Sequence, residues 1–169
     1  MKRGVYAGSF DPVTRGHLEV IRRASLIVDE LHIMVGANRK KSSSLFTVEK
    51  RLKLVEESLE SMAWFGKDRR AFHLGEFTGL LMDYCKGHDI RFNIRGLRAV
   101  RDFNDEFEMH GTNHDMAPEV NTVFLVAPPE FQFISSSTIK ELAAHRSPAV
   151  NRYVTPCVAS ALLDANRSN

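Results

Sequence analysis

The chain has 169 residues, of which 43% are hydrophobic and 26% are charged, and its formal net charge is +2 at pH 7. This length and composition predict one compact globular domain with an ordinary core. A charge so close to zero gives no support for a nucleic acid or a membrane surface as partner. The sequence also lacks a signal-peptide pattern and any apolar run long enough to span a bilayer, so we expect a soluble protein.

The hydrophobic pattern alternates short β-prone runs with helix-period segments. Strands are predicted near Val5, Ile33, Phe72, Phe92 and Phe124, and helices over residues 18–28, 48–62, 79–86, 104–113 and 137–144. Such alternation predicts a Rossmann-like α/β fold, with a doubly wound, parallel, five-stranded sheet. We expect a single domain over residues 1–169 that ends in a short helical segment. In sheets of this kind, ligands bind beyond the carboxyl ends of the strands.

Residues 8–17, Gly-Ser-Phe-Asp-Pro-Val-Thr-Arg-Gly-His, follow the first predicted strand and lead into a helix. Gly8 allows a sharp exit from the strand, and the helix amides that follow suit an anion. Ser9 and His17 add a hydroxyl and a ring donor to the same wall. The segment predicts a phosphate-binding turn, although His17 alone would equally fit a structural histidine in a capped turn. Asp11 is interpreted as a turn or cap residue and not as a catalytic base.

Residues 38–44, Asn-Arg-Lys-Lys-Ser-Ser-Ser, separate the second strand from a helix that Thr47 is expected to cap. A loop of this composition is usually solvated surface. Arg95 and Arg98 flank Gly96 at the end of the fourth strand, where their planar guanidinium groups suit phosphate. The alternative is a pair of surface arginines that bridge to Asp102 or Asp105.

Residues 134–140, Ile-Ser-Ser-Ser-Thr-Ile-Lys, place three hydroxyls at the start of a helix after the fifth strand. One serine is a good helix cap in any protein, but three in a row exceed that need. Hydroxyls together with free helix amides suit a triphosphate or a departing pyrophosphate. These serines therefore predict a second anion-binding turn.

Two further sets of residues are interpreted as structural. Cys85 and Cys157 form no Cys-x-x-Cys pair, and we expect small, buried, apolar residues in a reducing cytoplasm. His110 and His114 have the i, i+4 spacing of helix-borne metal ligands, but no third His or Cys follows at ligand spacing. We therefore predict no metal ligands in the chain.

The segment over residues 8–17 resembles the nucleotidyltransferase superfamily, whose His-x-Gly-His signature here has Thr14 in its first position. With Arg-Gly-Leu-Arg at 95–98 and the serine segment, residues 3–157 are similar to the phosphopantetheine adenylyltransferases. The resemblance implies a nucleotidyltransferase fold and reversible adenylyl transfer from ATP to 4'-phosphopantetheine, giving dephospho-coenzyme A and pyrophosphate. It also implies Mg²⁺ as cofactor, a homohexamer and a cytoplasmic location.

The resemblance also assigns residues to roles. Catalysis falls to His17 as a transition-state stabiliser, with Lys41 and Arg95. The acceptor is assigned to Ser9, Lys41, Leu81 and Arg95, and ATP is assigned to Ser9, Phe10, His17, Gly96, Leu97, Arg98, Glu106, Phe131, Gln132, Phe133, Ile134, Ser135, Ser136 and Ser137. Lys40 is the alternative to Lys41, because this loop is one residue longer than the usual family pattern.

Two other classes of function share parts of this pattern. A nicotinamide mononucleotide adenylyltransferase or a glycerol-phosphate cytidylyltransferase shares the loop and the serines, but usually carries His at the position of Thr14 and lacks Arg-Gly-Leu-Arg. A nucleotide sensor would bind ATP tightly without releasing pyrophosphate.

Overall fold

The computed structural model describes residues 1–37, 44–65, 71–98 and 100–167. Strands and helices alternate along the chain in the order β1 (Arg3–Gly8), α1 (Arg15–Ala24), β2 (Glu30–Gly36), α2 (Val48–Glu60), β3 (Phe72–Phe77), α3 (Leu81–Gly87), β4 (Phe92–Leu97), α4 (Val100–Met116) and β5 (Asn121–Val126). A short 3₁₀ helix, η3 (Pro129–Phe131), precedes α5 (Ser136–Ala144), α6 (Val150–Tyr153) and α7 (Pro156–Ala165). All five predicted strands are confirmed.

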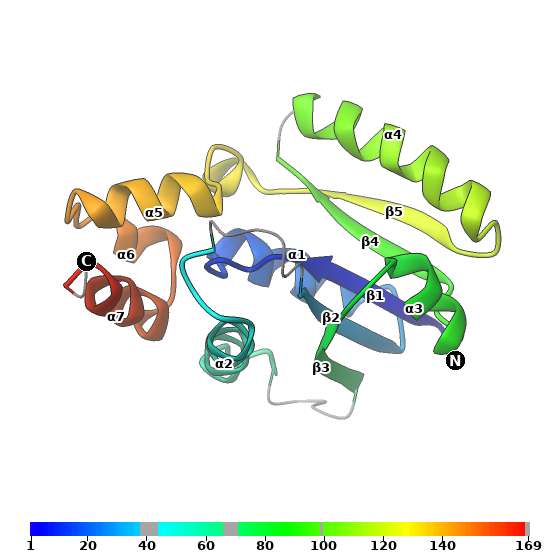
Figure 1. The fold of residues 1–169 in the computed structure, drawn as a ribbon, viewed down its shortest axis with the longest axis horizontal. Coiled ribbons are helices and arrows are strands. Elements are labelled where there is room, and N and C mark those ends of the chain that lie inside the picture. The colour runs from blue at the N-terminus through cyan, green and yellow to red at the C-terminus, as the bar shows by residue number, and fades with distance from the viewer. Residues whose placement is uncertain (38–43, 66–70, 99, 168–169) are drawn as a thin grey trace.

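The five strands form one parallel sheet in the order β3-β2-β1-β4-β5 (Figure 1). The chain builds outward from β1 to β3 and then returns to the other side of β1 with β4. The order therefore reverses between β1 and β4, and the connections at their carboxyl ends diverge to leave a crevice. This topology confirms the predicted doubly wound fold.

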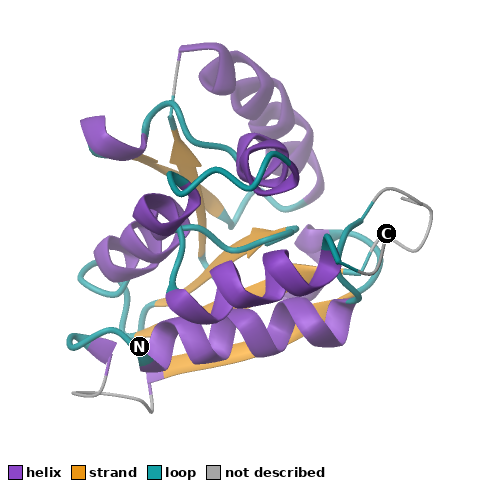
Figure 2. Ribbon diagram, turned by 90° about the vertical axis from the view of Figure 1, so that its left-hand side faces the viewer, coloured by secondary structure: helices purple, strands orange, loops and turns teal. Residues whose placement is uncertain are grey.

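Helices cover both faces of the sheet, as Figure 2 shows. Successive residues of β1 point to opposite faces, so Tyr6 packs in the core beside α1 and α2, while Val5 and Ala7 pack against α3. Helices α5 to α7 extend the first of these cores. Cys85 is buried on the α3 side as a free thiol, and burial raises its pKa to about 11. Cys157 is also free and is partly buried.

Several element boundaries differ from those predicted. Helix α1 begins at Arg15, three residues earlier than expected, because Thr14 caps it. Arg95 lies within β4 and not after it, since the strand continues to pair with β5 beyond its apolar start. Helix α4 runs from Val100 to Met116 and is longer at both ends than predicted, because the added residues 100–103 and 114–116 mix polar and apolar side chains without a clear helical period. No helix among the described residues has the length and apolar character that a membrane crossing requires.

The buried carboxylate of Asp11, in the β1–α1 loop, joins three distant segments. It accepts hydrogen bonds from the backbone N–H groups of Leu45 and Phe46, both at 2.9 Å, just before α2. It also pairs with Lys140 Nζ of α5 at 3.1 Å. Asp11 therefore has a structural role in the turn after β1, but it joins distant segments and does not cap a helix.

Two more hydrogen bonds fasten the same loop. Ser136 Oγ of α5 donates to the carbonyl oxygen of Pro12 at 2.9 Å, and Arg51 Nη1 of α2 donates to the carbonyl oxygen of Ser9 at 2.8 Å. The loop that follows β1 is consequently held by both α2 and α5, on elements far apart in the sequence.

Replacing Asp11 should destabilise the fold strongly. Asp11→Ala leaves two backbone amides and a lysine ammonium without their acceptor, and we expect it to lower the free energy of unfolding by about 3 kcal/mol. Glu57→Ala is the control, because Glu57 forms a solvent-exposed ion pair with Lys53 one turn away in α2 and should cost less than about 1 kcal/mol. Urea denaturation measures both, and equal losses for the two variants would contradict the role of Asp11.

Candidate active site

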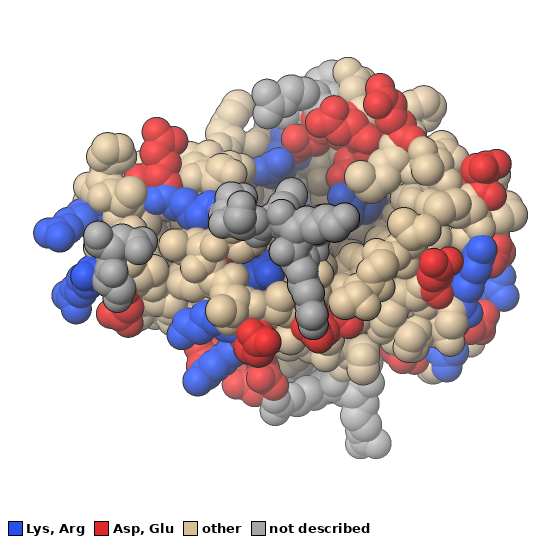
Figure 3. All heavy atoms as spheres, in the orientation of Figure 1, with Lys and Arg blue, Asp and Glu red and all other residues tan. Residues whose placement is uncertain are grey.

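A cavity of about 290 Å³ lies at the carboxyl ends of β1 and β4, where the strand order reverses. Residues from β1, α1, β4, α4 and α5 and their connections line it: Tyr6, Ala7, Gly8, Ser9, Thr14, Gly16, His17, Val20, Arg95, Gly96, Arg98, Glu106, Ala127, Ile134, Ser135, Ser136 and Ser137. Figure 3 shows a hollow in the upper part of the molecule, with basic and acidic side chains beside it. Three of the four segments singled out in the sequence, residues 8–17, 95–98 and 134–140, contribute to the cavity, and residues 38–43 of the fourth lie outside the described part of the chain.

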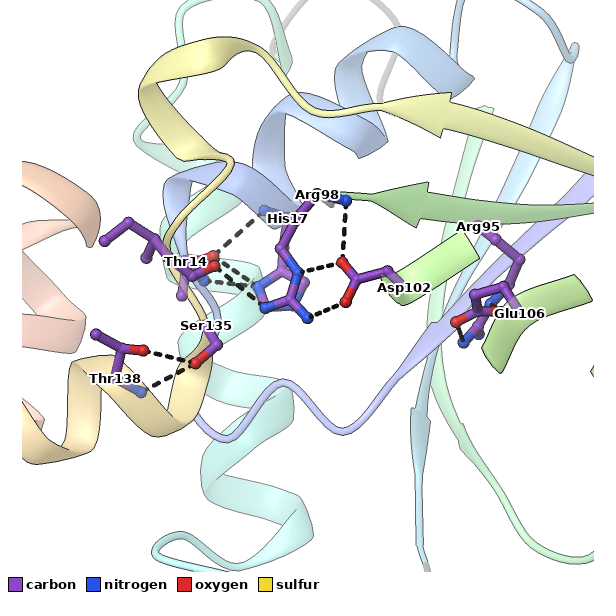
Figure 4. A network of polar contacts seen from close by, with 9 residues as sticks. Thr14, His17, Arg95, Arg98, Asp102, Glu106, Ser135 and Thr138 are labelled. Carbon is purple, nitrogen blue, oxygen red and sulfur yellow. Dashed lines mark hydrogen bonds and ion pairs between the residues drawn. The ribbon is translucent and has the colours of Figure 1, made fainter. Parts of the chain in front are cut away.

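The first wall is the beginning of α1, where Thr14 and His17 form a reciprocal capping box (Figure 4). Thr14 Oγ1 accepts the backbone N–H of His17 at 3.4 Å, and His17 Nδ1 accepts the backbone N–H of Thr14 at 3.0 Å. In the usual capping box, Glu or Gln takes the position that His17 occupies here. The capping box holds the imidazole ring of His17 at the N-terminus of α1.

This geometry also determines where the imidazole carries its proton. A backbone N–H can only donate, so Nδ1 of His17 is the unprotonated acceptor, and the neutral ring holds its proton on Nε2. Thr14 Oγ1 lies 2.8 Å from the same Nδ1 atom. Burial, aided by the positive charge of Arg98, lowers the pKa of His17 to about 4. At neutral pH His17 is therefore an uncharged donor, and no described residue accepts from Nε2.

On the opposite wall, Arg95 is held by Glu106. Two guanidinium nitrogens, Nε and Nη2, bind the two oxygens of the Glu106 carboxylate, and Nη1 donates to the carbonyl oxygen of Ala7 at 3.1 Å. Both side chains are largely buried, with 20% and 17% of their surfaces exposed. These bonds use three of the five N–H groups of Arg95, so two remain for a ligand.

Arg98 is anchored in a similar way to the first turn of α4. Its Nε atom lies 3.1 Å from Asp102 Oδ2, and its backbone N–H donates to the same oxygen at 3.0 Å. A further hydrogen bond, from Nη1 to the carbonyl oxygen of Ile134 at 3.2 Å, links it to the segment before α5. The bridge to Asp102 that the sequence left open is therefore present, and Arg98 still lines the cavity.

The third wall is the beginning of α5, and its three serines have different surroundings. Ser135 caps the helix by accepting the backbone N–H of Thr138 at 3.0 Å, and Ser136 bonds Pro12 as described above. The hydroxyl of exposed Ser137 has no bond to another described residue. The amides of Ser136 and Ser137 belong to the first helical turn, which lacks intrahelical acceptors. The positive ends of α1 and α5 thus both meet the cavity.

The residues predicted for the site divide into three groups. Those that line the cavity are Ser9, His17, Arg95, Gly96, Arg98, Glu106, Ile134, Ser135, Ser136 and Ser137. Outside its lining are Phe10, Leu81, Leu97, Phe131, Gln132 and Phe133. Lys41 and its alternative, Lys40, fall outside the described residues.

Some residues outside the lining have evident structural roles. Phe10 is fully buried and packs edge-on against His17, with ring centroids 5.2 Å apart. Gln132 donates from Nε2 to the carbonyl oxygen of Ala127, whereas the Phe133 side chain is 87% exposed.

Sequence reasoning missed Tyr6 and Val20 as cavity residues, and it missed the capping role of Thr14. The Thr-x-x-His spacing of 14 and 17 is a capping-box pattern that could have revealed the second of these. Tyr6 carries no local signal, because it reads as an ordinary apolar position of a buried strand.

The described residues do not supply a metal-binding cage. They contain no group of three or more His, Cys, Asp and Glu side chains placed to hold a metal ion. The carboxylates beside the cavity, Asp102 and Glu106, are paired with Arg98 and Arg95. His110 and His114 have ring centroids 5.9 Å apart, and His110 lies within hydrogen-bonding distance of Thr122. Within the described residues, no cluster of protein side chains therefore marks a metal site.

A parallel sheet with two helix N-termini, a histidine and two arginines at its reversal point fits a nucleotidyltransferase. The cytidylyltransferase-like family model matches residues 5–142 and shows this class. The chain is 42% identical to the phosphopantetheine adenylyltransferase of Lachnoclostridium phytofermentans, covering 97% of this chain and 95% of that protein. The enzyme of the same name from Thermotoga neapolitana is 44% identical, over 95% of this chain and 94% of the relative. The chain belongs to the phosphopantetheine adenylyltransferase family.

Solved structures support the fold at much lower sequence identity. The nicotinic acid mononucleotide adenylyltransferase of Plasmodium falciparum, complexed with NaAD, superposes with a TM-score of 0.72 at 15% identity, covering 98% of this chain and 97% of that chain. A bifunctional NMN adenylyltransferase/ADP ribose pyrophosphatase from Francisella tularensis gives a TM-score of 0.72 at 14% identity, over 98% of this chain and 51% of that chain. These likenesses confirm the nucleotidyltransferase fold.

The protonation of His17 is directly testable. Long-range ¹H–¹⁵N NMR should show Nδ1 unprotonated and Nε2 protonated from pH 6 to 8, with a titration midpoint near pH 4. Because the pKa is below its unfolded value of about 6.5, the unfolded chain binds this proton more readily. The contribution of His17 to stability is then complete above about pH 6.5 and is lost as the pH falls toward 4. A midpoint near 6.5, or a proton on Nδ1, would contradict the geometry.

Proposed function

We propose that the chain transfers the adenylyl group of ATP reversibly to 4'-phosphopantetheine, giving dephospho-coenzyme A and pyrophosphate in coenzyme A biosynthesis. The observation that carries this proposal is the meeting of two helix N-termini, His17 Nε2–H and two arginines at one cavity in a chain of this family. Such a cavity suits a ligand with several phosphates. We expect the reaction to be reversible, because the phosphoanhydride bond broken in ATP is replaced by the phosphoanhydride bond of dephospho-coenzyme A.

The reaction needs little covalent chemistry from the protein. The acceptor is a phosphate monoester that is already largely anionic near neutral pH, so its oxygen attacks the α-phosphorus of ATP without a general base. Pyrophosphate leaves from the opposite side of that phosphorus. The requirement on the protein is alignment of the two substrates and stabilisation of negative charge in the transition state.

We assign these tasks to residues with fixed surroundings. His17 Nε2–H donates to an oxygen on the α-phosphorus, and no proton passes to or from the acceptor. Arg95 uses its two remaining N–H groups for the acceptor phosphate while Glu106 holds its orientation. The amides of Ser136 and Ser137, with the Ser137 hydroxyl, receive the β- and γ-phosphates.

The remaining assignments rest on family resemblance. Lys41, with Lys40 as the alternative, contributes a cation from the loop after β2. Ser9 contacts both substrates, and the backbone of Leu81, the first residue of α3, meets the pantetheine arm. Residues 131–134 contact ATP, as do Phe10 and the backbone from Gly96 to Arg98.

Mg²⁺ enters this proposal with the nucleotide. Mg²⁺ is commonly held by substrate phosphates and few protein ligands, and the carboxylates nearest the cavity are engaged by arginines. When bound, the ion neutralises charge on the triphosphate. A homohexamer and a cytoplasmic location are further proposals from the resemblance, and sedimentation equilibrium showing a monomer at micromolar concentration would remove the first.

A substrate panel tests the proposed reaction. The purified protein with Mg-ATP is offered 4'-phosphopantetheine, nicotinamide mononucleotide and glycerol 3-phosphate separately, and pyrophosphate release is measured. We expect turnover with 4'-phosphopantetheine alone. Turnover with only another acceptor would identify a sister enzyme, whereas ATP binding without pyrophosphate release from any acceptor would identify a sensor.

A further inference from the structure

Tyr6 is a buried residue of β1 whose side chain reaches the floor of the cavity. Only 6% of its surface is exposed. Its ring packs edge-on against Phe10, with centroids 5.6 Å apart, and lies 6.5 Å from the His17 ring. The ring is therefore held firmly between the sheet and α1, and its position is set by the core.

The hydroxyl of Tyr6 has no hydrogen-bonding partner among the described residues, although the side chain lines the cavity. The Tyr6 side chain is largely buried, but its hydroxyl oxygen is not among the fully buried polar atoms that lack a partner in this part of the chain, so it reaches the open space of the cavity. Tyrosine hydroxyls in such positions usually bind a partner. Tyr84 illustrates the usual case, since its hydroxyl lies 2.9 Å from His32 Nδ1. The hydroxyl of Tyr6 is thus placed where a ligand can satisfy it.

The space around this hydroxyl is kept open by Gly96 of β4. A Cβ atom at this position would lie 2.9 Å from Val20 Cγ2 and 3.6 Å from the Tyr6 hydroxyl oxygen. Even alanine would therefore press on Val20 of α1, and its Cβ atom would be in van der Waals contact with the hydroxyl oxygen. Because Gly96 has no side chain, β4 lies close to Val20 and to the Tyr6 hydroxyl without filling the cavity.

The charges near Tyr6 are those of Arg95, Arg98 and Glu106, but burial has the largest effect and raises the pKa of Tyr6 to about 12. The phenol keeps its proton at neutral pH. Each arginine already has a carboxylate and a backbone carbonyl as partners. By contrast, neither the Tyr6 hydroxyl nor His17 Nε2–H has an acceptor among the described residues.

We propose that Tyr6 is a nucleotide-binding residue whose hydroxyl donates a hydrogen bond to an oxygen of the bound nucleotide, beside His17. The inference deepens the proposed function and rests on it for the identity of the ligand. The oxygen belongs to a phosphate or to the ribose, and both present the same acceptor chemistry.

Calorimetric titration of ATP into Tyr6→Phe tests this inference. We expect the Kd for ATP to rise about 10-fold, the usual effect of losing a hydrogen bond to a ligand. The melting temperature should stay the same or increase, because no hydrogen bond within the described protein is lost. Adenosine distinguishes the acceptors: a matching loss of adenosine affinity identifies the ribose, and a loss confined to ATP identifies a phosphate.

Tyr84→Phe is the matched control. It should lower the melting temperature through the lost contact with His32 and leave the Kd for ATP unchanged. The inference is overturned if Tyr6→Phe binds ATP within twofold of the unmodified chain. Pyrophosphate release by the unmodified chain is measured in parallel and tests the proposed reaction separately. If that reaction fails, the ratio of the two Kd values for ATP still decides the role of Tyr6.

Discussion

The buried carboxylate of Asp11 is the constraint on which the cavity depends. It satisfies two backbone amides before α2 and the ammonium of Lys140 in α5, so one side chain joins segments 34 and 129 residues away. Together with the hydrogen bond from Ser136 to the Pro12 carbonyl oxygen, it fixes the loop after β1 relative to α5. With this loop fixed, the N-termini of α1 and α5 both line one cavity, which is the proposed site for the phosphates of the nucleotide.

The same loop positions His17 through Thr14. The Thr14 amide makes Nδ1 an acceptor and leaves the proton on Nε2, while burial keeps the ring neutral. A neutral imidazole donor stabilises developing negative charge without the cost of burying a cation, and its fixed geometry requires no reorganisation during the reaction. Arg95 and Arg98 are also preorganised, because Glu106 and Asp102 hold their guanidinium groups in place within the protein itself.

The sequence was sufficient for the strands, the doubly wound topology and the three cavity segments, because each depends on local pattern and on the geometry of parallel sheets. It was insufficient where a role depends on contacts across the fold. Glu106 carries no local sequence signal for its partner, yet it binds Arg95 eleven residues earlier. Ser136 looked like a phosphate ligand, yet its hydroxyl is bonded to Pro12. Tyr6 looked like core, and only the approach of β4 at Gly96 reveals its hydroxyl at the cavity.

The central claim is that His17 stabilises the transition state as a preorganised hydrogen-bond donor. Steady-state kinetics of His17→Ala, with ATP affinity and melting temperature measured on the same preparation, tests it most directly. The account predicts that kcat falls roughly 10²-fold to 10³-fold, the usual cost of one such donor, while ATP affinity falls much less because other contacts hold the ground state. A variant that is less stable but turns over normally per folded molecule would contradict it and leave His17 a structural residue.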